Sequence, residues 1–84
     1  MELHEMVEAV DNREDLIKFI NQLRMDLRNN KGEWENITLE DYLEAMEAWV
    51  NDMDGYYLNN NEILPKQPSW RTIAEILIAS SMYE

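Results

Sequence analysis

The central part of the chain carries apolar residues spaced three and four apart, which is the period of one buried face of an α-helix. Thr38 precedes this run as a good N-cap, with Asp41 three residues later in the position of a capping box. Gly55 follows it as the kind of residue that often ends a helix. The pattern predicts a helix from about Leu39 to Asp54. Its predicted buried face comprises Leu39, Tyr42, Leu43, Met46, Trp49, Val50 and Met53.

Three other segments also show helical spacing. One begins after Asp11 or Asn12 and runs to about Arg28, with acidic residues in its first turn and basic residues in its last, which suits the helix dipole. Another begins after Ser69, a good N-cap, and its wide apolar arc predicts that it is the most buried helix. The first ten residues predict a short helix that depends on the core for support.

No segment predicts a pair of β-strands, so the expected fold is all-α. A chain of 84 residues is too small to divide its core between two units. We therefore expect a single compact bundle of three main helices with a short N-terminal helix, forming one domain over residues 1–84. The predicted loop from Gly55 to Ser69 is long for such a domain, and long ordered loops often carry function.

The charge of the chain is concentrated in one stretch. Between Lys31 and Lys66 there is no lysine or arginine, and most of the net charge of -11 lies there. Such a block repels itself, which favours a role in contact with a positively charged partner. The nine carboxylates of this stretch are Glu33, Glu35, Glu40, Asp41, Glu44, Glu47, Asp52, Asp54 and Glu62.

Composition argues against several classes of function. Without cysteine there is no disulfide framework, thiolate nucleophile or thiolate zinc site. No segment approaches the roughly 20 apolar residues of a membrane span, so a cytoplasmic location is expected. An acidic surface disfavours binding to nucleic acid and to anionic membranes. His4 is the only histidine and no serine has a recognisable base, so the sequence predicts no enzyme, no catalytic residue and no cofactor.

The run from Asn51 to Glu62 is the nearest approach to a metal motif. With Gly55 at the sixth position of an EF-hand loop, Asp52 and Asp54 occupy the third and fifth positions correctly. The first and twelfth positions then fall on residues that cannot supply the required ligands. We interpret the run as a helix C-terminus and predict no metal site.

Glu40, Glu44, Glu47 and Asp54 project along one side of the predicted central helix, with Asn51 filling the gap between the last two. No lysine on this helix offsets their repulsion, which costs roughly 0.2 to 0.5 kcal/mol for each neighbouring pair. Together with Asp52 they are our candidates for contact with a partner. A merely solvated acidic face is an equally open interpretation.

The aromatic residues divide into core and surface candidates. Trp49 and Trp70 fall on apolar helix faces and are expected in the core. Trp34 lies in a loop between two glutamates, where it either closes the end of the core or serves as an exposed anchor. Of Tyr56 and Tyr57, one can pack inward while the other presents its hydroxyl. Trp34, Tyr56 and Tyr57 are therefore candidate anchors for a basic partner.

Three segments of the chain, REDLIKFINQLRMDL, EWENITLEDYLEAMEAWVNDMDGYY and PSWRTIAEILIASSMYE, resemble a family of small acidic bacterial proteins classed as a domain of unknown function. The resemblance extends from Asn12 to Glu84. It implies the boundaries of a domain and no established activity. In size and charge the chain is also similar to the immunity proteins that neutralise bacterial toxins, although no motif is shared.

Two main functional hypotheses follow from the sequence, and a third, an accessory subunit of an enzyme, is not distinguished from the first by composition. The first is a non-enzymatic protein-binding module that presents its acids to a basic protein surface, such as a toxin, in the manner of an immunity or antitoxin-like inhibitor. The alternative is a self-associating structural or regulatory module, a homodimer whose interface would involve Met25, Ile76 and Met82.

Overall fold

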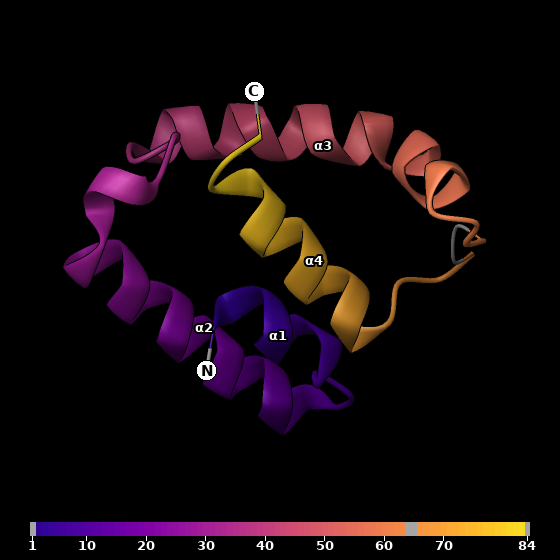
Figure 1. Ribbon diagram of the computed structural model, residues 1–84, viewed down its shortest axis with the longest axis horizontal. Coiled ribbons are helices and arrows are strands. Elements are labelled where there is room, and N and C mark those ends of the chain that lie inside the picture. The colour runs from indigo at the N-terminus through magenta and orange to yellow at the C-terminus, as the bar shows by residue number, and fades with distance from the viewer. Residues whose placement is uncertain (1, 64–65, 84) are drawn as a thin grey trace.

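The structure, a computed structural model, describes residues 2–63 and 66–83 and confirms the predicted all-α bundle. Its elements are α1 (Leu3–Glu8), α2 (Arg13–Asn29), the 3₁₀ helix η1 (Lys31–Glu33), α3 (Leu39–Asn59) and α4 (Trp70–Ser80) (Figure 1).

The predicted N-caps form as expected, because a cap depends only on residues within one turn of it. Asn12 accepts the Asp15 amide at 2.8 Å, and Thr38 accepts the Asp41 amide at 3.1 Å. The return bond predicted from the Asp41 side chain is not formed in the described part of the chain. A reciprocal capping box occurs at the start of α4 instead, between Ser69 and Thr72.

The predicted end of the central helix is wrong. α3 continues through Gly55 to Asn59, and no described glycine has a positive φ. The left-handed residue after the helix is Asn61, with φ 58°. The helix continues because Tyr57 packs on its buried face, and this packing outweighs the roughly 1 kcal/mol that glycine costs within a helix. The loop predicted from Gly55 is correspondingly shorter, and Leu64 and Pro65 within it lie outside the described residues.

α4 is the central element of the fold. It packs against α1, α2 and α3, and α1 also packs against α2. Apart from α4, no helix among the described residues has a Cα atom within 8 Å of one in α3. In Figure 1 α4 runs between α3 on one side and the α1–α2 pair on the other. The prediction that α4 is the most buried helix agrees with this position.

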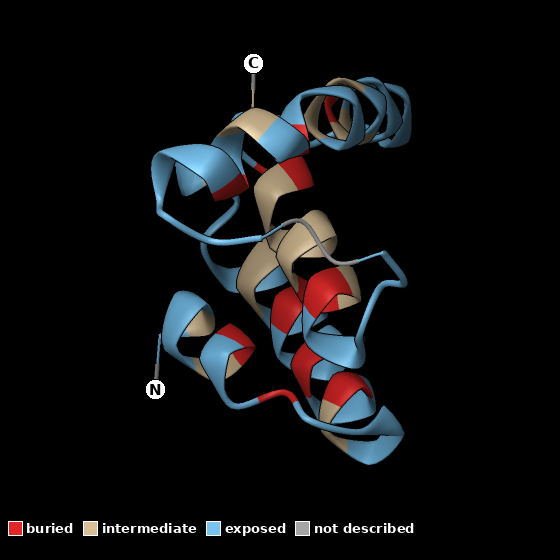
Figure 2. Cartoon of the chain, turned by 90° about the vertical axis from the view of Figure 1, so that its right-hand side faces the viewer, coloured by how far each residue is buried: buried red, intermediate tan, exposed pale blue. Residues whose placement is uncertain are grey.

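The main core lies where α1, α2 and α4 meet, and Figure 2 shows most of the buried residues there, with α3 largely exposed. Phe19 and Ala74, both 0% exposed, lie at its centre. Trp70 does not join this core as predicted, since it is 42% exposed at the start of α4. The buried cluster comprises Val7, Val10, Leu16, Phe19, Leu23 and Ala74.

Candidate functional site

The acidic residues predicted to share one side of α3 are all exposed. We call Glu40, Glu44, Glu47 and Asp54 the acidic ridge. The only ion pair among the described residues joins His4 and Glu2, far from the ridge in sequence. The ridge carboxylates are therefore not neutralised by any cation within 4.0 Å in the described part of the chain.

The cationic side chains lie mainly on the other side of the molecule. Four are in α2 and one is in η1, whereas α3 has none. Arg24 of α2 lines a groove together with Leu39 at the start of α3, but within the described ranges none of the cations pairs with a ridge carboxylate within 4.0 Å. The charge separation seen in the sequence thus persists in space. The seven basic residues are Arg13, Lys18, Arg24, Arg28, Lys31, Lys66 and Arg71.

Asp52 does not belong to the acidic ridge. It lies roughly 120° around α3 from the ridge by helical geometry. Its carboxylate accepts a hydrogen bond from the Tyr83 hydroxyl, which raises the pKa of Tyr83. Asp52 therefore joins the C-terminal segment to α3, and its contact with a partner stays a prediction.

Three residues predicted to face the core are instead exposed beside the ridge. Leu39 is 73% exposed, Leu43 51% and Val50 47%; we call them the exposed apolar stripe. The physical reason is that α3 packs against α4 alone, so only a narrow face of α3 is covered. The stripe adjoins the acidic ridge on the helix surface, since Leu43 and Glu47 are separated by about one turn.

Trp34 closes the end of the core and is not an exposed anchor. Its Nε1 donates to Asp26 Oδ2 at 2.8 Å, and its ring stacks on Tyr42 with centroids 6.1 Å apart. The Tyr42 hydroxyl in turn donates to the Leu77 carbonyl at 2.7 Å. These contacts fix the segment between α2 and α3, and they favour the first of the two interpretations of Trp34, a residue that closes the end of the core.

The tyrosine pair divides as the sequence analysis anticipated. Tyr57 is 5% exposed, and its hydroxyl donates to Glu75 Oε2 at 3.2 Å. Burial, and then the charge of Glu75, raise the pKa of Tyr57 to about 12. Tyr56 is 41% exposed. Of the two, only Tyr56 is available to a partner on this surface.

Tyr56 forms part of a groove that the sequence did not predict. Its ring meets that of Trp49 edge to face, with the ring centroids 4.9 Å apart. The centroids of Trp49 and Tyr83 are 5.4 Å apart. With Glu8 of α1 and Glu75 of α4, these rings line a groove of about 330 Å³, which we call the aromatic groove. No sequence signal places Tyr83 against Trp49, because their contact spans the long segment between α3 and the C-terminus.

A larger apolar groove lies on the other side of α4, in the angle between α2 and α3. Its volume is about 480 Å³, and Leu77 of α4 and Tyr42 of α3 line it. Ile20 from α2, 39% exposed, and Ile37 before α3, 48% exposed, also line it. This groove exists because α2 and α3 share no direct contact.

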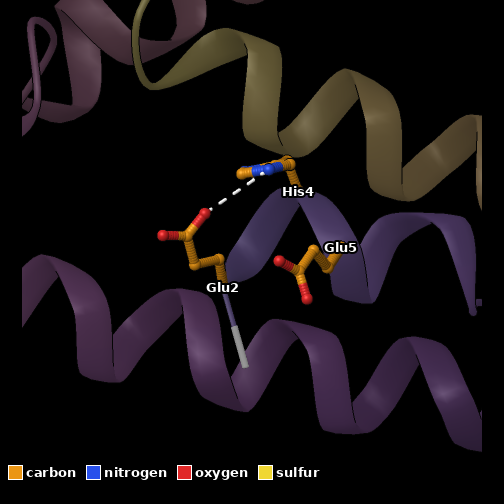
Figure 3. Close-up of side chains that lie close together, drawn as sticks. All are labelled: Glu2, His4 and Glu5. Carbon is orange, nitrogen blue, oxygen red and sulfur yellow. Dashed lines mark ion pairs between the residues drawn. The ribbon is translucent and has the colours of Figure 1, made fainter.

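Glu2, His4 and Glu5 form the one group of potential metal ligands among the described residues, with ligand atoms within 4.8 Å of one another. His4 Nε2 lies 3.4 Å from Glu2 Oε2 (Figure 3). All three side chains are exposed, at or near the start of a helix of six residues. The run considered for calcium is helical as far as Asn59, so it does not form an EF-hand loop.

No helix in the described part of the chain combines the length and apolar character needed to cross a membrane. A family model described as "Family of unknown function (DUF7660)" matches residues 12–84. This range agrees with the extent of the resemblance noted from the sequence. Neither the curated proteins nor the solved structures contain a match to the chain.

Proposed function

Since the chain belongs to the DUF7660 family, whose function is unknown, we propose a role from its own surface: a non-enzymatic module that binds a basic protein, as an immunity or antitoxin-like inhibitor does. The proposal rests on one observation, the acidic ridge without a neutralising cation. Keeping like charges adjacent on a helix lowers stability, and a cationic partner removes that cost on binding.

The exposed apolar stripe supports this proposal. Leu39, Leu43 and Val50 adjoin the acidic ridge, so one side of α3 offers apolar contact area bordered by charge. Protein interfaces commonly combine an apolar centre with a polar rim. In this arrangement the ridge accelerates the encounter with a basic protein and the stripe supplies the contact that retains it. We place this role in the cytoplasm and expect neither nucleic acid nor a membrane as partner.

Capture from the native host tests the proposal with three baits, each first checked to be folded. The first is the wild type, and the second carries Glu40→Gln, Glu44→Gln and Glu47→Gln. The third is a matched control in which three exposed acids outside α3, Glu5, Glu14 and Glu33, are changed to glutamine.

We expect the wild type and the control to recover the same basic protein and the ridge variant to lose it. The association rate of the recovered protein should fall at least about tenfold in the ridge variant and decrease with salt. Recovery of that protein by all three baits alike contradicts the proposal.

A second candidate function, self-association, is favoured by the apolar groove between α2 and α3. Met25 and Met82, named from the sequence as interface residues, are 40% and 56% exposed. Ile76 is only half-buried. Light scattering at two concentrations distinguishes the candidates, because a homodimer has a mass near twice 10.1 kDa with no partner present.

A further inference from the structure

The aromatic groove brings together residues from three separate parts of the chain. Trp49 and Tyr56 come from α3, Glu8 comes from α1, and Glu75 and Tyr83 come from α4 and the segment after it. Its volume of about 330 Å³ lies at the small end of the range for ligand sites, which suits one long side chain rather than a whole cofactor.

The aromatic walls of the groove are held in place by contacts outside it. Tyr83 is anchored by its hydrogen bond to Asp52. Tyr56 contacts the buried ring of Tyr57 edge to face at 5.5 Å, in addition to Trp49. Rings fixed in this way need little further ordering when a ligand binds, so less conformational entropy is lost.

The groove also carries two carboxylates, Glu8 and Glu75, and the imidazole of His4 lines it as well. Glu75 is partly buried, and burial is the main cause that raises its pKa; the Tyr57 hydroxyl opposes this effect, and Glu62 and Glu8 add to it. The charge of Arg71, one turn earlier in α4, lowers the pKa of Glu75, and its effect is the smallest of these contributions. Over the described ranges, no lysine or arginine lies within 4.0 Å of Glu75 or Glu8.

We propose that the aromatic groove receives a lysine or arginine side chain of the basic protein partner, with Glu75 and Glu8 as its carboxylate contacts and Trp49, Tyr56 and Tyr83 as its aromatic walls. Aromatic rings and carboxylates both attract a cation, and the two carboxylates repel an anion. The proposal rests on the proposed function for the identity of the partner and names the place where one of its cations is bound.

Nuclear magnetic resonance tests the groove without the unidentified partner. The probe is N-acetyl-arginine methylamide, and its neutral analogue N-acetyl-citrulline methylamide is the control ligand. The readout is the indole N–H resonance of Trp49, assigned with Trp49→Phe. The indoles of Trp34 and Trp70 lie outside the groove and serve as internal references.

We expect the arginine probe to shift the Trp49 resonance to saturation and the citrulline probe to leave it in place. Glu75→Gln, which can still accept the bond from Tyr57, should weaken the arginine affinity at least about threefold. Tyr83→Leu should weaken it as well. Glu47→Gln removes the same charge from the acidic ridge and should change the affinity less than about twofold at physiological salt.

Equal shifts with both ligands, equal shifts of all three indoles, or an unchanged affinity in Glu75→Gln each overturn the proposal. A Trp49 resonance that moves on dilution without any ligand assigns the groove to a second copy of the chain and also overturns it.

The two proposals fail separately. If the arginine probe causes no shift of the Trp49 resonance, the groove proposal is contradicted, while capture that depends on the acidic ridge still supports the proposed function. If all baits capture the partner equally, the proposed function is contradicted. A Trp49 shift with the arginine probe alone would still support the groove as a site for a cationic side chain.

Discussion

The two half-buried tryptophans, Trp34 and Trp49, differ in whether the indole nitrogen donates a hydrogen bond. Trp34 donates to the carboxylate of Asp26. The Nε1 atom of Trp49 is buried and has no partner in the described part of the chain. A bond to a charged acceptor stabilises the folded state, whereas a buried donor without a partner costs free energy. Similar residues in the sequence therefore contribute differently to stability.

Replacing each of these tryptophans by phenylalanine removes the same atoms at both positions. The difference between the two variants therefore reports on the hydrogen bond of the indole nitrogen. We expect Trp34→Phe to lower the free energy of unfolding by about 1 to 3 kcal/mol more than Trp49→Phe does. Urea denaturation with an unchanged m-value provides the measurement. Equal losses in the two variants contradict the assignment of the Trp34 bond.

The raised pKa of Glu75, caused chiefly by burial, gives a signed prediction for pH. The folded state binds this proton more tightly than the unfolded chain does. The resulting stability is fully present below the ordinary pKa of 4.5 and is lost as the pH rises through the raised value.

The melting temperature of the wild type should therefore decrease with rising pH over this window more steeply than that of Glu75→Gln. Glu47→Gln, with the same loss of charge on the acidic ridge, is the matched control. Identical slopes in wild type and Glu75→Gln show that the folded environment does not act on this carboxyl.

At the scale of the element, α3 provides the sharpest test of the fold. Gly55 lies inside the helix, and a Cβ atom added there has no neighbour within 4 Å. Gly55→Ala should raise the free energy of unfolding by about 0.5 to 1 kcal/mol, because alanine loses less backbone entropy in a helix. Thermal unfolding measures the change. Had Gly55 been the left-handed cap suggested by the sequence, the same substitution would destabilise the protein.

Most features that depend on residues close in sequence were predicted correctly, whereas several features that depend on another helix were missed. Thr38 and Ser69 were identified as caps, and Asn12 as one of two candidates, because the partners of a cap lie within one turn. The end of α3 was missed because it depends on Tyr57 packing near Glu75, which lies in another helix. Helical spacing marked Leu39 as a core residue, but spacing carries no information on how many helices cover a face.

The candidate site follows the same division. The acidic ridge was found because residues three and four apart on one helix share a side. The aromatic groove was missed because Trp49 and Tyr83 meet only through the packing of α4 on α3. One of Tyr56 and Tyr57 was expected to pack inward, and only tertiary contacts show that it is Tyr57.

For the whole molecule, the net charge of -11 together with a single ion pair among the described residues predicts a salt response. Sodium chloride screens repulsion between exposed acids, so the melting temperature should rise between low salt and about 0.5 M. The ridge variant with three glutamines should start higher and rise less. A melting temperature that falls with added salt indicates that attractive pairs dominate instead.

α4 is the only helix of the described ranges with Cα atoms within 8 Å of those in α3. A protein that touched both α3 and α2 would bridge two helices that do not pack directly against each other. Part of the free energy of such binding would reinforce the attachment of α3, so occupancy and resistance to unfolding would increase together. Binding in the angle between α2 and α3 would in this way also stabilise the folded protein.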